Sequence, residues 1–235
     1  MEKRGGIRLF VPPYAGGNTT SFNAFRAPFA TRGFELVPLE LPGHGRRITE
    51  PLLTDIGAMV DDLYALVAVR LDRPFAFWGH SMGSLLAWLL AQRIERAGVA
   101  KPLALVVSGR RAPHLPERHP PRHTLPRPAF IEELRRFGGL PEEVLNHPAY
   151  MEYAEPIIRA DFQALDTYVH VAGAPLTVPI GVLMGDRDDV TLEEAERWRE
   201  ATRGPVIVER VAGGHFFLHD APDATAARVA RLIGC

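Results

Sequence analysis

Residues 75–97 constrain this chain more than any other segment. A short apolar strand at 75–78 leads into Gly79-His-Ser-Met-Gly83, and a largely apolar helix follows at 84–97. A serine on so sharp a strand-to-helix turn has a strained backbone, and glycines two residues before and after it avoid collisions. The helix N-terminus favours negative charge that develops beside the serine. The pattern therefore predicts a nucleophile at Ser81, with an ordinary glycine-rich turn as the alternative.

Apolar strands alternate with helical patterns along the rest of the chain. Strands are predicted at 7–11, 34–39, 75–78, 103–108, 180–184 and 206–211. Helices are predicted around Ile56 to Val67 and at 84–97, 191–201 and 222–233. Strands that are apolar throughout are typical of a parallel sheet covered on both faces. The order predicts an α/β fold with a doubly wound, mostly parallel sheet.

One segment interrupts the alternation. Residues 112–128 contain six prolines, three arginines and three histidines, and helical pieces follow at 128–137, 141–146 and 148–170. An insertion after a strand of a parallel sheet lies over the ligand-binding edge. Residues 112–170 are therefore interpreted as a helical lid that moves largely as a unit, with Gly138-Gly139 as a hinge. A rigid helical decoration is the alternative. Five apolar side chains are expected to face a pocket below it: Phe130, Leu134, Phe137, Ile157 and Phe162.

Composition narrows the classes of partner and location. The chain has 235 residues, 46% of them hydrophobic, which suffices for one large α/β domain. A net charge of −1 argues against a nucleic-acid partner. No apolar run is long enough to cross a bilayer, and no signal peptide is recognisable. The lone Cys235 suits a reducing compartment, so a cytoplasmic protein is expected.

A serine nucleophile needs a base, and His215 fits that role. It follows the last predicted strand in a glycine-rich turn, where an imidazole can reach the edge of the sheet. The histidine trio in the Pro-rich segment (His114, His119 and His123) raises the alternative of a metal site. No cysteine or ordered carboxylate accompanies the trio, so a solvated loop is favoured and no metal or cofactor is predicted.

The carboxylate that orients the base is expected after strand 180–184. Three aspartates follow this strand, and the spacing Gly-x-x-Asp-x-Val selects Asp188. Asp186 is expected to bond the backbone of its own turn. Asp189 remains the competitor.

Two backbone N–H groups should stabilise the oxyanion. One is expected from Met82, directly after the nucleophile. The other is expected from the loop at 11–17, where Pro12 and Pro13 have no N–H, so Tyr14 or Ala15 must donate.

With these parts in order, the chain resembles an α/β-hydrolase, and more narrowly the type II thioesterases of nonribosomal peptide and polyketide assembly lines. The resemblance runs nearly end to end, as one domain over 1–235 with the lid at 112–170. Its most specific strings are Pro-Gly-His-Gly-Arg at 42–46 and Ser-Gly-Arg-Arg-Ala-Pro at 108–113. Arg-Ala-Asp-Phe at 159–162 and Gly-Gly-His-Phe at 213–216 add to it. One departure is Pro-Pro-Tyr in the first loop, where many relatives have Leu-Pro-Tyr or Leu-Pro-His.

The resemblance implies a triad of Ser81, Asp188 and His215. It also implies hydrolysis of acyl or aminoacyl groups misloaded on the phosphopantetheine arm of a carrier protein, with no cofactor of the enzyme's own. The chain is expected to act as a monomer. An acidic carrier protein is a plausible partner for a group of arginines, although a solvated loop face explains them equally well: Arg110, Arg111, Arg118, Arg122 and Arg127. Two alternatives remain, namely a free-standing esterase or acyl-CoA hydrolase and a non-catalytic binding protein of the same fold.

Overall fold

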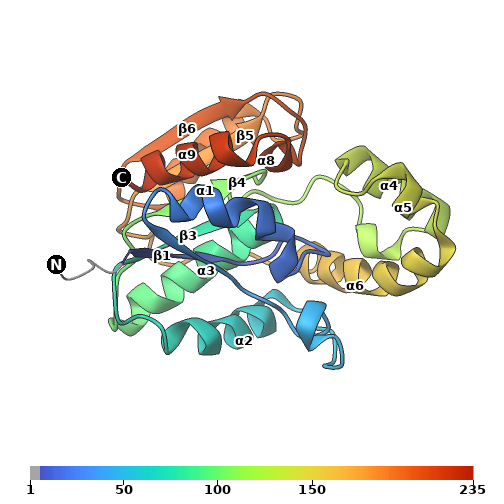
Figure 1. The fold of residues 1–235 in the computed structure, drawn as a ribbon, viewed down its shortest axis with the longest axis horizontal. Coiled ribbons are helices and arrows are strands. Elements are labelled where there is room, and N and C mark those ends of the chain that lie inside the picture. The colour runs from blue at the N-terminus through green and yellow to red at the C-terminus, as the bar shows by residue number, and fades with distance from the viewer. Residues whose placement is uncertain (1–5, 235) are drawn as a thin grey trace.

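A single parallel sheet organises the molecule. The computed structural model describes residues 6–234. In this part of the chain six strands pair in the order β2-β1-β3-β4-β5-β6, and every pairing is parallel (Figure 1). The strands are β1 (Ile7–Val11), β2 (Phe34–Pro38), β3 (Phe75–His80), β4 (Leu105–Ser108), β5 (Ile180–Gly185) and β6 (Val206–Val211).

Helices cover both faces of the sheet, so the predicted doubly wound α/β fold is confirmed (Figure 1). One face carries η1 (Thr19–Phe25), α1 (Arg26–Ala30) and α9 (Pro222–Ile233). The other carries α2 (Ile56–Ala68), α3 (Met82–Ala97), α7 (Leu192–Glu196) and η4 (Arg197–Ala201). On each face, the helices and the sheet form a separate cluster of buried apolar side chains. No helix within residues 6–234 has the length and apolar character needed to span a membrane.

Element boundaries depart from the sequence prediction at several places. Strand β3 continues to His80 and α3 begins at Met82, two residues earlier than predicted, because Ser81 itself is the helix N-cap. The segment predicted as one helix at 191–201 divides into α7 and η4. The helical segment at 19–30 was not predicted. Its three phenylalanines, Phe22, Phe25 and Phe29, recur at helical spacing and are fully buried.

Between β4 and β5 the chain forms a separate helical layer beyond the carboxyl ends of the strands (Figure 1). This layer contains η3 (Arg122–Thr124), α4 (Arg127–Phe137), α5 (Glu142–Leu145) and α6 (Pro148–Asp166). A third apolar cluster joins α4 and α5 to α6. Two short elements flank the same edge of the sheet, η2 (Gly45–Arg47) and α8 (Phe217–Asp220).

Candidate active site

Ser81 lies on a strained turn between β3 and α3. Its φ of 51° and ψ of −120° make it the one non-glycine residue with positive φ among residues 6–234. A Cβ on Gly79 would lie 2.1 Å from the Gly83 carbonyl oxygen, and a Cβ on Gly83 would lie 2.4 Å from that of Pro12. Only glycine fits at either position. Strain of this kind persists only where the surroundings hold it, as is common at catalytic residues.

A buried hydrogen-bond network holds this turn from below. The Gly79 carbonyl lies 2.9 Å from Oγ of both Ser84 and Ser108. Oγ of Ser84 also accepts the Ser108 N–H at 3.0 Å, and Ser108 Oγ lies 3.0 Å from Nδ1 of His80. Burial holds the pKa of His80 well below its usual value, and the neighbouring His215 lowers it further. A neutral His80 therefore lies beneath the turn and leaves proton transfer to another group.

The turns after β5 and β6 bring Asp188 and His215 together. Three bonds join the two turns: Asp186 N–H to the Val211 carbonyl at 2.8 Å, Arg187 N–H to the Gly213 carbonyl at 3.0 Å, and Gly213 N–H to Asp186 Oδ1 at 2.9 Å. With the turns fixed, His215 Nδ1 lies 2.9 Å from Asp188 Oδ1. The Asp188 side chain is only 3% exposed. The carboxylate therefore fixes the imidazole with Nδ1 as its donor, which leaves Nε2 as the basic nitrogen.

The other two aspartates of this turn have different partners. Asp186 was predicted to bond the backbone of its own turn. In the structure its Oδ1 instead accepts the N–H of Gly213, in the loop that carries His215. The Asp189 side chain pairs with Arg136 of α4 and not with His215. Burial raises the pKa of Asp189, but the hydrogen bond from Arg136 and the positive charges of Arg136, His119 and Arg118 together outweigh it and hold the pKa below its usual value. Asp189 thus links the turn to the helical layer.

The first loop leaves two backbone donors beside Ser81. Gly17 N–H bonds the Tyr14 carbonyl at 2.8 Å, and Gly16 N–H bonds Asp161 Oδ2 at 2.7 Å. Tyr14 and Ala15 remain as the candidate donors of this loop, and both line the same cavity as Ser81. Met82 begins α3, where the first N–H groups have no acceptor within the helix.

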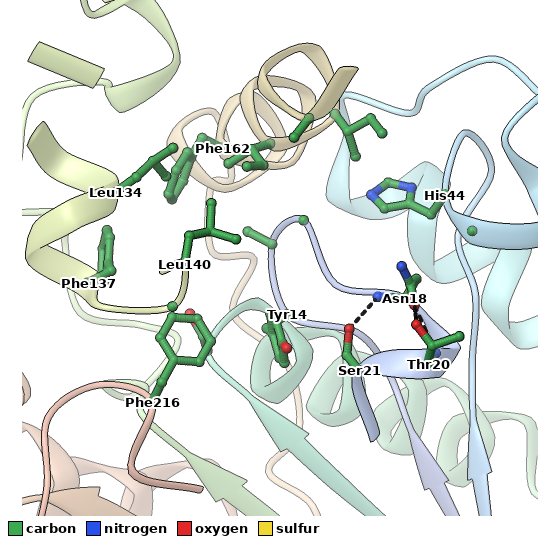
Figure 2. A pocket seen from close by; sticks show the side chains of 18 of the residues that line it. Tyr14, Asn18, Thr20, Ser21, His44, Leu134, Phe137, Leu140, Phe162 and Phe216 are labelled. Atoms are coloured by element: carbon green, nitrogen blue, oxygen red, sulfur yellow. Dashed lines mark hydrogen bonds between the residues drawn. The ribbon is translucent and has the colours of Figure 1, made fainter. Parts of the chain in front are cut away.

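A cavity of about 300 Å³ lies between the helical layer and the edge of the sheet (Figure 2). Ser81 and His215 lie at its wall. Figure 2 shows apolar side chains from α4 and the following loop on one side of the cavity, and polar side chains near Asn18 on another. Four of the five lid residues expected to face a pocket do so, namely Leu134, Phe137, Ile157 and Phe162. Phe130 does not: it is fully buried within the helical layer, against Phe162 and beneath the Arg159 guanidinium.

A buried ion pair that the sequence did not predict connects three motifs at this cavity. Asp161 of α6 is fully buried, and its Oδ2 lies 3.0 Å from His44 Nε2 while accepting the Gly16 N–H. Burial lowers the pKa of His44, but the hydrogen bond and charge of Asp161, with smaller contributions from the Pro42 carbonyl and Glu40, together outweigh it and raise that pKa above its usual value. Asp161 therefore fixes α6 to the loop that carries Tyr14 and Ala15.

Replacing Asp161 by alanine should destabilise the protein and also slow turnover. The change leaves His44 Nε2 and the Gly16 N–H without an acceptor, so we expect a loss of about 3 kcal/mol in unfolding free energy. Because the loop beside Ser81 loses its anchor, kcat should fall as well. Urea unfolding and steady-state kinetics measure the two effects. Asp166→Ala is the matched control, since it removes a second lid Asp–His pair, with His123, away from this loop. Equal kcat in the two variants would contradict a role in positioning the loop.

The contacts of Asp161 with Gly16 and His44 indicate which part of the expected lid can move. Because Asp161 fixes α6 to Gly16 and His44, the mobile part should be α4 and α5, whose C-caps are Gly138 and Asn146. Amide hydrogen exchange should be faster in α4 and α5 than in α6. It should slow in α4 and α5 when a nonhydrolysable ligand fills the cavity beside Ser81. Equal exchange rates over residues 112–170 would instead favour a lid that moves as a whole, and rates as slow as in the sheet would indicate a rigid cap.

Comparison with known proteins identifies the family. The Thioesterase domain family model matches residues 7–233. The chain belongs to this family. Like its relatives, this thioesterase is a hydrolase of thioester bonds, and the family resemblance inferred from its motifs is confirmed.

Three relatives show the closeness of the match. The gramicidin S biosynthesis protein GrsT of Aneurinibacillus migulanus is 37% identical to the thioesterase over 215 residues, 91% of this chain and 84% of the relative. The structure of the type II thioesterase BorB from the borrelidin biosynthetic cluster superposes with a TM-score of 0.89 at 35% identity, over 98% of this chain and 94% of BorB. ClbQ from the colibactin nonribosomal peptide and polyketide pathway gives a TM-score of 0.89 at 32% identity, over 97% of each chain.

Proposed function

We propose that this thioesterase removes misloaded acyl and aminoacyl groups from the phosphopantetheine arm of carrier proteins, with Ser81, His215 and Asp188 as a catalytic triad. The observation that carries the proposal is the Asp188–His215 hydrogen bond, at a cavity wall shared with a strained Ser81. The relatives' place in peptide and polyketide biosynthesis supports carrier proteins as partners.

The chemistry follows from these three side chains. His215 Nε2 accepts the proton of Ser81 Oγ as the oxygen attacks the thioester carbonyl. N–H groups of Met82 and of Ala15 or Tyr14 stabilise the oxyanion. The intermediate then expels the arm's sulfur, which takes the proton from His215, and an acyl-enzyme remains. Water gives a proton to His215 Nε2 as it attacks the ester; the bond from the carbonyl carbon to Ser81 Oγ then breaks, Oγ takes the proton back from His215, and the free acid leaves. A thiolate leaves readily, so the reaction needs no cofactor besides the arm that carries the substrate.

The size of the cavity supports an editing role. At about 300 Å³ it lies at the lower end of the range for ligand pockets. It suits a short acyl or aminoacyl group rather than a complete peptide or polyketide chain. Apolar lid residues such as Ile157 can bury the chain, while Asn18 and Ser21 offer polar contacts to an amino or hydroxyl group.

The proposal is tested by presenting one short acyl group on three carriers: a carrier protein, coenzyme A and N-acetylcysteamine. We expect the highest kcat/KM for the carrier protein, and a lower value when the acyl group is lengthened to a full product chain. Ser81→Ala gives the background rate for each substrate. Equal or higher kcat/KM with acyl-coenzyme A, or with a simple ester, would instead support a free-standing acyl-CoA hydrolase or esterase.

A further inference from the structure

A second, smaller cavity of about 70 Å³ lies against the other side of the candidate triad. Ser81, His215 and Asp188 line it, whereas no residue of the 14–17 loop does. Phe137 and Phe162 line both cavities and separate them. The remaining wall comes from the segment that follows β4, including the Ser-Gly-Arg-Arg-Ala-Pro string.

Arg110, in that string, lacks a partner for its charge. Among residues 6–234 its guanidinium makes no ion pair, and its Nε is buried without a hydrogen-bond partner. Burial accordingly holds the pKa of Arg110 below its usual value, and the charge of Glu117 only partly opposes this. The residue is partly exposed and its guanidinium has no carboxylate partner within residues 6–234, so it can donate to a ligand that enters the cavity it lines.

The neighbouring arginines of the cavity do have partners. Arg122 Nε bonds Glu133 Oε1 at 2.9 Å, and Arg118 pairs with Glu194 at 3.2 Å. Arg111 lies 3.5 Å from Glu194 and donates to the Pro116 carbonyl at 2.6 Å, although its Nε and Nη1 make no hydrogen bond. Arg110 differs from these arginines in that no carboxylate of residues 6–234 forms an ion pair with it.

Its backbone is also fixed in place. The Arg110 carbonyl accepts a hydrogen bond at 2.9 Å from Nε1 of Trp198, a fully buried side chain. Gly109, which precedes it, has a φ of +59°, and a Cβ there would lie 2.5 Å from the His80 ring. The main chain therefore has little freedom to withdraw Arg110 from the cavity.

The position of the small cavity relative to His215 indicates which part of a substrate enters it. The imidazole must give its proton to the leaving group, so the leaving group lies beside His215 and on the side away from the oxyanion loop. The larger cavity, which includes that loop, is left for the acyl group. Exposed residues Glu117 and Arg118 line the small cavity as well, so a chain arriving from solvent can pass them to reach Ser81.

We propose that the small cavity receives the thiol end of the pantetheine arm, and that the Arg110 guanidinium donates a hydrogen bond to the amide carbonyl oxygen nearest the sulfur. This inference rests on the proposed function, because it takes a phosphopantetheine thioester as the substrate. Arg110 then selects the leaving group, whereas the residues of the larger cavity select the acyl group.

The test compares two thioesters of butyric acid. The N-acetylcysteamine thioester carries the amide carbonyl, and the S-pentyl thioester has a chain of similar length without it. In Arg110→Leu, kcat/KM for the amide-bearing substrate should fall about 10- to 100-fold, the effect of one lost charged hydrogen bond. The S-pentyl substrate should change by less than about threefold, since its leaving group offers no acceptor to Arg110. Arg110→Lys, which keeps a donor, should restore part of the preference. Arg197→Leu, at an exposed position outside both cavities, is the control.

Parallel losses on both substrates would show that Arg110 only supports the fold, and an unchanged preference would show that it does not contact the leaving group. Either result overturns the inference. A different result would contradict the proposed function alone: the preference for the N-acetylcysteamine thioester is lost in Arg110→Leu as expected, yet the wild-type enzyme does not hydrolyse acyl groups on carrier proteins.

Discussion

Ser81→Ala should lower kcat for thioester hydrolysis by about 10⁴-fold or more while the fold remains intact. The hydroxyl is the atom proposed to form the acyl-enzyme, and no other hydroxyl occupies the same strained turn. Alanine is smaller than serine and the Ser81 N–H bond to the Ser108 carbonyl, at 2.8 Å, does not involve the side chain. Thermal unfolding should therefore change little. Single-turnover kinetics on an acyl carrier protein measure the effect.

Covalent labelling gives an independent control for this prediction. A serine-directed phosphonate should add its mass to the peptide that contains Ser81 in the wild-type protein and leave Ser81→Ala unlabelled. Ser84 lies close by in sequence, but its hydroxyl is buried and bonded to the Gly79 carbonyl, so it should not react. Labelling at any other residue would show that the turn is not the nucleophilic site.

The parts of the site that could be predicted from sequence are those encoded locally. Gly79, Ser81 and Gly83 lie within one short turn, so the motif is recognisable from five residues. The collision that requires glycine at 79 is with the nearby Gly83 backbone, whereas the collision at 83 is with the Pro12 carbonyl of the distant first loop. The buried strands could also be predicted locally, because each is a short run of mostly apolar residues next to one another in sequence. Helix starts were less predictable, since the N-cap of α3 is Ser81, which is also the candidate nucleophile.

The remaining parts depend on contacts between distant segments. His44 and Asp161 are separated by 117 positions, and each stands in a motif string whose chemistry is not evident until the two meet. The unpartnered charge of Arg110 is likewise invisible in sequence, where five arginines between 110 and 127 look alike. What distinguishes them is which carboxylates the fold brings near, and that is decided by α4, α6 and α7.

Two adjacent aspartates in the turn after β5, Asp188 and Asp189, have different partners in the structure. Asp188 accepts from His215, and the backbone N–H of Asp189 also donates to Asp188 Oδ1 at 2.8 Å, which holds the carboxylate in its orientation. The Asp189 side chain is 47% exposed and pairs with Arg136 on the lid helix α4. Exchange of a single carboxylate for an amide can therefore separate the two roles.

Asp188→Asn should reduce kcat about 100-fold or more, because an amide no longer favours the His215 tautomer with its proton on Nδ1 and does not stabilise the imidazolium. Asp189→Asn is the matched control, made one residue away with the same change of charge. It should cost far less in kcat, since an exposed ion pair to Arg136 contributes little. Steady-state kinetics on one thioester, with circular dichroism to verify folding, distinguish them. A larger loss of kcat in Asp189→Asn than in Asp188→Asn would mean that Asp189 turns inward to His215 during catalysis. We expect the loss in Asp189→Asn to be small because the Asp189 side chain pairs outward with Arg136 of α4.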